Sequence, residues 1–285
     1  MKKAVIVTLL VVASSTIGYS QSINMPVIPE DGVTIKFDQI DETVSFDSSP
    51  PWDFSSQTVA SEYSMSVLPV DASSSASNYP NATHVLQSDN GEFFLGYESN
   101  SVTSYGKIGS STTTNYSTPL VLVNFPISSS TVHADSIESS VEWMGLTADA
   151  TDKMEVTGIA SGSVTMPDGT THENAVLLST KRTTVYGPSP FDTFLEIEEI
   201  THQWWVENCP IPAIEVLEAY SNESLVLSRT LFLKTETSDI KTHDFKANDL
   251  HMVVDINGKQ SGVKTNIPQL YIYKNGMVKK KVIVE

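Results

Sequence analysis

Residues 162–187 read GSVTMPDGTTHENAVLLSTKRTTVYG, and this stretch decides the fold class. The Pro-Asp-Gly sequence at residues 167–169 separates two runs that are rich in Val, Thr and Leu. Asp-Gly favours the positive φ angles of a tight hairpin turn, whose twist matches that of the flanking strands. The stretch therefore predicts two antiparallel strands joined by a short turn.

The same pattern occurs elsewhere in the chain. Asp89-Asn90-Gly91, Asn257-Gly258 and Asn275-Gly276 each separate two β-prone runs. In FLEIEEI (194–200), apolar and acidic residues alternate with the period of a half-buried strand. The segment AIEVLEAYSNE (213–223) fits a helix or a strand equally well. The sequence predicts an all-β protein whose main domain is an antiparallel β-sandwich or open barrel.

Composition limits the classes of partner. The chain has 285 residues, of which 40% are hydrophobic and 18% are charged, so it can bury a core. Its formal net charge is −17, and such a surface repels phosphate backbones and anionic lipid headgroups. We therefore expect no nucleic-acid partner.

The N-terminus predicts export. MKKAVIVTLLVVASSTIGYSQ combines two lysines, a short apolar run and a region of small residues, which is the pattern of a secretory signal peptide over residues 1–20. The apolar run is too short to span a bilayer as a stable helix, and no later stretch is long and apolar enough to do so. We expect a main domain over residues 22–235, a linker over 236–249 and a small β domain over 250–285.

The last segment, LHMVVDINGKQSGVKTNIPQLYIYKNGMVKKKVIVE, resembles the C-terminal sorting domain that the type IX secretion system of Gram-negative bacteria recognises. The likeness lies in a D-x-x-G-K turn, a Y-I strand and a Lys-rich closing strand. The family's upstream Pro-Asn-Pro element is missing, and Gln269 stands where a glycine is common. The resemblance implies a small β-sandwich-like domain that is read by the secretion machinery. Its candidate signal residues are Asp255, Gly258, Lys259, Leu270, Tyr271, Ile272, Gly276, Lys280 and Val282.

A second resemblance covers about residues 118–220. This region is similar to a β-rich core that often accompanies such tails, through Phe125-Pro126, the hairpin sequence at 162–170 and Trp204-Trp205 followed by Ile211-Pro212. That core has no assigned chemistry. Both resemblances imply a destination, secreted or at the cell surface via the periplasm, and neither implies a reaction.

Residues that could carry chemistry have plain structural interpretations. Cys209 cannot form an internal disulfide because it is the only cysteine, and its apolar surroundings favour a buried structural role. The group around His133 lacks the spacing of a helical zinc site. The segment TADATDKME (147–155) fits a solvated acidic loop better than a calcium loop. We predict no catalytic residue, no metal ligand and no cofactor.

Trp204 and Trp205 are the exception, as a speculative ligand platform. Adjacent residues of a strand point to opposite sides, so one ring belongs to the core and the other could stack on a sugar from an exposed face. The primary expectation is an exported, non-enzymatic extracellular or surface protein. The alternative is a secreted carbohydrate-binding protein or hydrolase that uses the main β domain.

Overall fold

The computed structural model describes residues 21–98, 100–143, 145–187, 195–234, 250–255, 261, 264–265, 269–273 and 278–281. The chain divides into two compact units, Met1–Lys234 and Thr235–Glu285, and the division falls beside the predicted end of the main domain at residue 235. The predicted signal peptide (1–20) and linker (236–249) lie outside the described residues.

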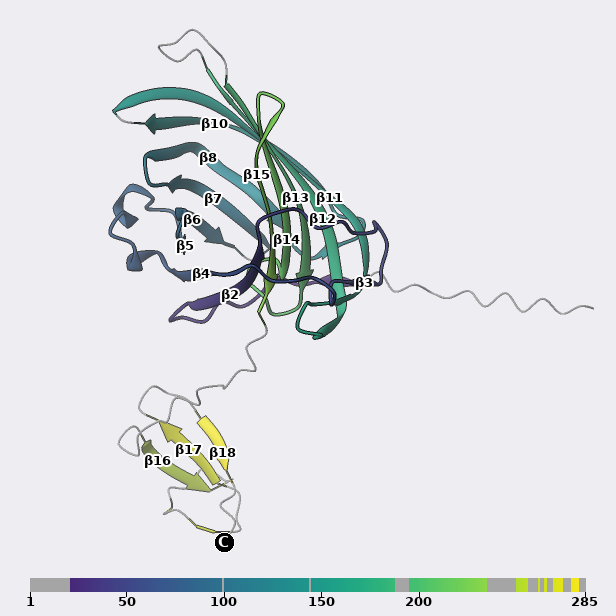
Figure 1. Ribbon diagram of the computed structural model, residues 1–285. Coiled ribbons are helices and arrows are strands. Elements are labelled where there is room, and N and C mark those ends of the chain that lie inside the picture. The colour runs from purple at the N-terminus through teal and green to yellow at the C-terminus, as the bar shows by residue number, and fades with distance from the viewer. Residues whose placement is uncertain are drawn as a thin grey trace, which may run out of the picture. The chain divides into compact units, whose positions relative to one another are not determined.

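The described residues of the first unit are almost entirely β, which confirms the predicted fold class (Figure 1). The ambiguous segment after Ala213 forms a strand. Helix is confined, within the described residues, to two short 3₁₀ turns, and no helix there could cross a bilayer. The strands are β1 Ser22–Ile23, β2 Val33–Ile40, β3 Trp52–Asp53, β4 Ser61–Pro69, β5 His84–Ser88, β6 Gly91–Tyr97, β7 Ser101–Ile108, β8 Thr112–Asn124, β9 Ile127–Ser128, β10 Val132–Trp143, β11 Leu146–Thr165, β12 Thr171–Tyr186, β13 Leu195–Val206, β14 Ile214–Ser221 and β15 Ser224–Leu233.

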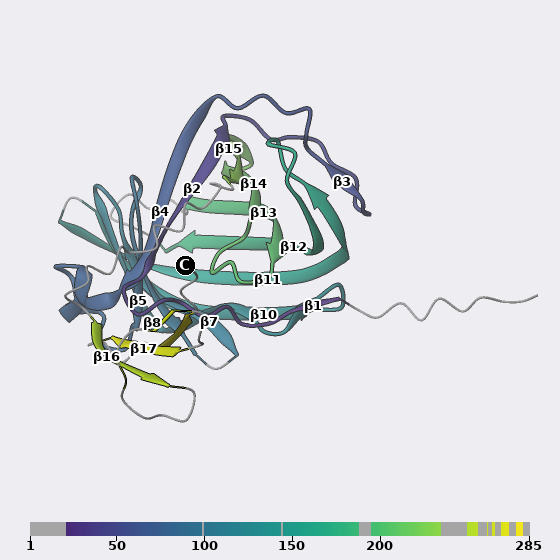
Figure 2. The ribbon, with the colours of Figure 1, turned by 90° about the horizontal axis from the view of Figure 1, so that it is seen from below.

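Most of these strands form one sheet that closes on itself. The order is β10-β8-β7-β6-β5-β4-β2-β15-β14-β13-β12-β11, with β3 added in parallel to β11. Because β10 also pairs with β11 along its whole length, the two ends of the series meet. Figure 2 shows β2, β15, β14, β13, β12 and β11 following one another in this order. The result is an antiparallel barrel-like sheet with an inner and an outer side.

Two of the four predicted hairpins lie within the described residues, and both are confirmed. Asp89 and Asn90 connect β5 to β6, and residues 166–170 connect β11 to β12. Gly169 has a φ of 83°, in the left-handed region that an Asp-Gly turn requires. The Asn257-Gly258 and Asn275-Gly276 turns lie outside the described residues.

The outer side of β13 is covered by the segment between β2 and β4. Trp204 is fully buried there, and its ring makes edge contacts with Phe46, Trp52 and Phe54 at centroid distances of 4.8–5.9 Å. The backbone N–H of Phe54 also donates to the carbonyl of Thr165 at the end of β11. This cover stabilises the barrel from outside by burying large aromatic surfaces.

On the inner side of the same strand, Trp205 packs in a second core group. Its ring lies 5.7 Å from that of Phe125, and the group also includes Val102, Val123 and Met154. Consecutive tryptophans therefore serve two different cores, as the alternation of side chains along a strand requires.

The second unit contains three described strands, β16 Leu250–Asp255, β17 Gln269–Tyr273 and β18 Val278–Lys281, which pair antiparallel in that order. The side-chain oxygen of Gln269 accepts from the backbone N–H of Lys264, and its amide donates to Ser261. Five candidate sorting residues fall in these strands: Asp255, Leu270, Tyr271, Ile272 and Lys280. The other four, Gly258, Lys259, Gly276 and Val282, lie outside the described residues.

Candidate functional site

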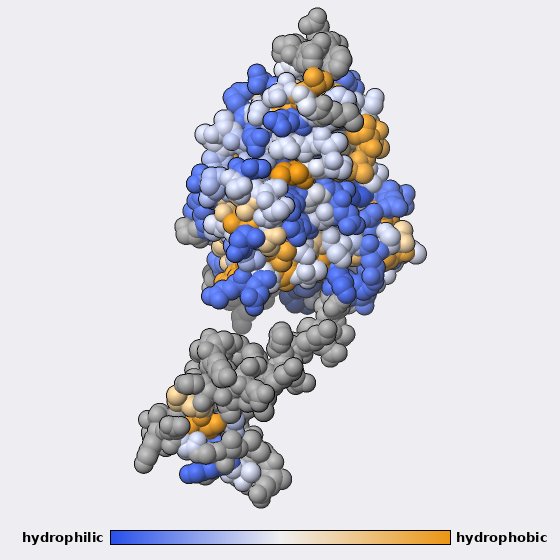
Figure 3. Space-filling view, turned by 90° about the vertical axis from the view of Figure 1, so that its left-hand side faces the viewer, coloured by the Kyte–Doolittle hydropathy of each residue, from blue (hydrophilic) through white to orange (hydrophobic). Residues whose placement is uncertain are grey.

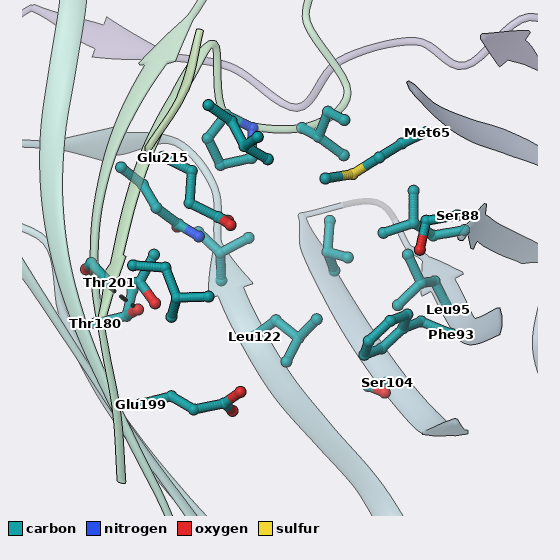
Figure 4. Close-up of a pocket in the computed structure, with 18 of the residues that line it drawn as sticks. Met65, Ser88, Phe93, Leu95, Ser104, Leu122, Thr180, Glu199, Thr201 and Glu215 are labelled. Carbon is teal, nitrogen blue, oxygen red and sulfur yellow. Dashed lines mark hydrogen bonds between the residues drawn. The ribbon is translucent and has the colours of Figure 1, made fainter. Parts of the chain in front are cut away.

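The barrel encloses a cavity of about 290 Å³. Figure 4 shows Glu199, Thr201 and Glu215 on one wall, and Met65, Phe93 and Leu95 among the side chains on the facing wall. The first wall is formed by β12 to β15, and the second by β4 to β8. Residues that are far apart in the sequence therefore line one interior space.

Apolar side chains form most of the cavity lining. Large aliphatic, aromatic and thioether groups come from nearly every strand around the ring, and Trp205 is among them. The others are Phe37, Tyr63, Met65, Leu86, Phe93, Leu95, Tyr97, Val102, Tyr116, Leu122, Val123, Met154, Ile211, Leu217 and Leu231. Such a lining with a few polar groups is typical of pockets for small molecules.

One polar group is a closed cage around Asp152, a residue of β11. Asp152 is fully buried, and its carboxylate accepts from the Arg182 Nε and Nη2 at 3.1 and 2.6 Å, from Thr184 at 2.8 Å and from Ser139 at 2.8 Å. The Arg182 Nη2 also donates to the Tyr116 hydroxyl at 2.6 Å. Charged groups are tolerated in an interior only when they are paired and hydrogen-bonded in this way.

The cage changes the ionisation of its members. Burial opposes the charge of Asp152, but Arg182 and the hydroxyl donors outweigh burial and hold the pKa of this carboxyl below its ordinary value. Burial raises the pKa of Tyr116 to about 12. Burial and the nearby charge of Arg182 lower the pKa of Lys107, while Glu199 opposes that shift. The cage is thus a linked set of charges, in which Arg182 and Tyr116 line the cavity and Asp152 does not.

A second polar group surrounds Arg229 of β15. The Arg229 Nη2 donates to Glu215 at 3.0 Å, and the guanidinium carbon lies 5.6 Å from the centre of the Tyr63 ring. The Nε of Arg229 is buried without a hydrogen-bond partner among the described residues. Arg229, Glu215 and Tyr63 all line the cavity.

This second group lies next to the surface. Asn90, an exposed residue of the β5–β6 turn, also lines the cavity, and its side-chain amide donates to the Tyr63 hydroxyl at 3.1 Å. The cavity therefore reaches solvent beside a chain of contacts that runs from Asn90 through Tyr63 to Arg229.

The prediction that Trp204 or Trp205 offers an exposed ring for ligand binding is wrong. Trp204 is completely buried under the outer cover, and Trp205 is only 5% exposed. The expected alternation holds, but both sides of β13 are covered at this point. Trp205 instead contributes to the wall of the internal cavity.

Of the remaining sequence interpretations, one is confirmed and one is wrong. Cys209 is buried, as predicted, and burial raises the pKa of its thiol. The segment 147–155 is part of strand β11, so its interpretation as a solvated loop is wrong, since Asp152 is buried in the cage. His133 contacts Asn124 and the carbonyl of Val121. No group of potential metal ligands occurs among the described residues.

Sequence reasoning missed the polar groups of the barrel interior. Arg182 and Arg229 are the only arginines in the chain, and each stands within a β-prone run. A cation in the middle of a strand, at the position of the inward residues, is the signal that could have identified them. Their acidic partners come from other strands, so no local pattern could reveal the pairs.

The outer surface is less distinctive. On the face shown in Figure 3, hydrophilic side chains dominate and apolar ones form small separate groups. The exposed large apolar residues of the first unit include Trp143 and the run Leu225, Val226 and Leu227 at the start of β15. Comparisons of the chain with family models, with curated proteins and with solved structures find no match.

Proposed function

We propose that the first unit is a non-enzymatic binding domain that holds a small, largely apolar molecule inside the barrel. The single observation that carries this proposal is the cavity of about 290 Å³ inside the barrel, with its apolar lining. Its volume is close to the lower end of the range for ligand pockets, roughly 300–1,000 Å³. Some barrels with fewer strands also hold single small ligands in their interiors.

The apolar lining itself favours a ligand. A molecule that covers apolar lining surface removes it from water, which contributes roughly 25 cal/mol for each Å² removed.

Binding is favoured over hydrolysis because both carboxylates that line the cavity are held by arginines. Glu215 lies 3.0 Å from Arg229, and Glu199 lies 3.6 Å from Arg182. A glycosidase needs two carboxyl groups that face a substrate between them, whereas each of these glutamates is already paired with an arginine. A sugar platform on Trp204 and Trp205 is not proposed, because both rings are buried.

Titration with the neutral fluorescent probe N-phenyl-1-naphthylamine tests this proposal. We expect saturable binding at one site with a blue shift, and loss of binding in Ser104→Phe, since Ser104 lines the cavity. Ser64→Phe is the matched control, because Ser64 is exposed between the inward-facing Tyr63 and Met65. Ser88→Phe, nearer the surface, replaces Ser104→Phe if the latter fails to fold. Absence of saturable binding, or equal binding by all variants, would refute the proposal.

We further propose that the protein is exported and that residues 250–285 act as its sorting signal, with the secretion machinery as partner. Support comes from the sequence resemblance and from the compact second unit with its three-stranded sheet. Deleting residues 250–285 should retain the protein in the periplasm, while the full chain reaches the cell surface or medium. Intact masses of both fractions measure this, and equal export of both forms would overturn the proposal.

A further inference from the structure

The two arginines of the barrel differ in how many of their guanidinium N–H donors are free of protein hydrogen bonds. Arg182 donates to Asp152 and Tyr116 and lies beside Glu199, so its guanidinium is held on several sides. Arg229 donates, among the described residues, only to Glu215. A guanidinium has five N–H donors in a fixed fork, and those of Arg229 that do not bond Glu215 are available to an acceptor in the cavity without loss of another protein hydrogen bond.

The charges around the cavity are balanced. Arg182 and Arg229 face Glu199 and Glu215 on the lining itself. Asp152 and Lys107, which are not part of the lining, add one charge of each sign, and Lys107 is close enough to interact with Arg182, Glu199 and Asp152. A charged ligand would add a charge without a counter-ion to this balanced set, and an unpaired charge in a mostly apolar cavity is costly.

The location of the Arg229 group indicates how a ligand would be oriented in the cavity. The Arg229 group lies beside the exposed Asn90, to which Tyr63 is hydrogen-bonded. Several of the other lining residues, Trp205, Met154 and Val102 among them, belong to the apolar core group on the inner side of the sheet. A ligand with one polar end would place that end at Arg229 and its apolar body against this group.

We propose that the ligand is an uncharged, mostly apolar molecule with a hydrogen-bond-accepting oxygen at one end, which accepts from the guanidinium of Arg229. An alcohol, ester or ketone with an aliphatic body has this chemistry. This inference rests on the proposed binding function and specifies its ligand class.

Competition against bound N-phenyl-1-naphthylamine tests the ligand class, with three probes of equal chain length kept below their micellar concentrations. We expect 1-dodecanol to displace the dye at concentrations about tenfold lower than dodecanoate or dodecyltrimethylammonium. If dodecanoate competes as well as or better than dodecanol, the cavity takes anions and the inference is wrong. If the dye itself does not bind, the proposed function fails instead, and the inference fails with it.

Two variants test the role of Arg229. Arg229→Lys keeps the charge balance but removes the guanidinium, and we expect dodecanol to bind about fivefold more weakly while the dye, whose polar atom is a donor, changes little. Glu215→Gln leaves one excess positive charge, so the preference should move toward dodecanoate. Lys181→Met, which breaks an ion pair with Glu198 at exposed side chains, is the control and should change neither. Unchanged dodecanol binding in Arg229→Lys and an unchanged preference in Glu215→Gln would overturn the inference.

Discussion

Arg182 and Arg229 occupy similar positions and have different surroundings. Each lies within a strand of the barrel, lines the cavity and has an acidic partner on a neighbouring strand. Arg182 is enclosed by Asp152, which is itself completely buried and accepts from three side chains. Arg229 has one acidic partner and an aromatic ring, and it lies near the surface at Asn90.

The difference separates a group that holds the fold from one that can bind a ligand. The cage around Asp152 joins β10, β11 and β12 at the place where the sheet closes on itself, so its loss should loosen the closure. The ion pair of the Arg229 group connects only two adjacent strands, β14 and β15, which the backbone ladder already holds together, and its further contact is with the Tyr63 ring of β4. Changes in the Asp152 cage should therefore lower the stability of the fold most, and changes in the Arg229 group should alter ligand binding most.

The largest effect should come from Asp152→Asn. The change removes the charge that compensates Arg182, and breaking a buried ion pair in this way typically costs about 3–5 kcal/mol. Urea unfolding followed by tryptophan fluorescence measures this loss, and all four tryptophans, Trp52, Trp143, Trp204 and Trp205, lie in the first unit. A loss below about 1 kcal/mol would show that the cage does not hold the closure.

The same pair should control stability at acid pH. The pKa of Asp152 is lowered in the folded protein, so its contribution is complete above the unfolded value, about 3.9, and is lost as pH falls through the folded value. The difference in stability between the wild type and Asp152→Asn should therefore be constant from about pH 5 to 8 and narrow below about pH 4. Urea midpoints of both proteins across this range measure it, and a difference that widens in acid would contradict the assigned cause.

A smaller loss should follow Glu215→Gln. Arg229 and Glu215 are both partly accessible, and the glutamine oxygen can still accept from the guanidinium, so we expect a loss of about 1 kcal/mol in the same urea experiment. The contrast with Asp152→Asn is the informative result. Equal losses in the two variants would mean that both arginine groups are structural.

The sequence predicted the strands better than their closure. Turn chemistry at Asp89-Asn90-Gly91 and at Asp168-Gly169 is local, and it specifies hairpins wherever β-prone runs flank it. Whether the series of hairpins closes depends on the pairing of β10 with β11 and of β2 with β15, of which the second joins residues far apart in the chain. No local pattern encodes the second of these pairings.

The cavity was less predictable than the strands. Trp204 and Trp205 were recognised as facing opposite sides, but the outer cover that buries Trp204 comes from residues 41–60, a segment rich in Ser, Pro and Asp that reads as irregular. The polar segment TADATDKME (147–155) is typical of a solvated loop. It lies in a strand because Arg182 from β12 pairs with the buried carboxylate of Asp152. Site residues that depend on partners from other strands require the tertiary structure.

The smallest effect should come from Lys181→Met, and it sharpens the comparison because Lys181 is the sequence neighbour of Arg182. Lys181 points away from the cage and pairs with Glu198, with about half of its side chain exposed. Exposed ion pairs contribute little because solvent screens them and ordering two long side chains costs entropy. The urea midpoint and the probe affinity should both equal those of the wild type within error. A loss approaching that of Asp152→Asn would mean that any polar change on β12 weakens the barrel, and the distinction between the two arginine groups would no longer hold.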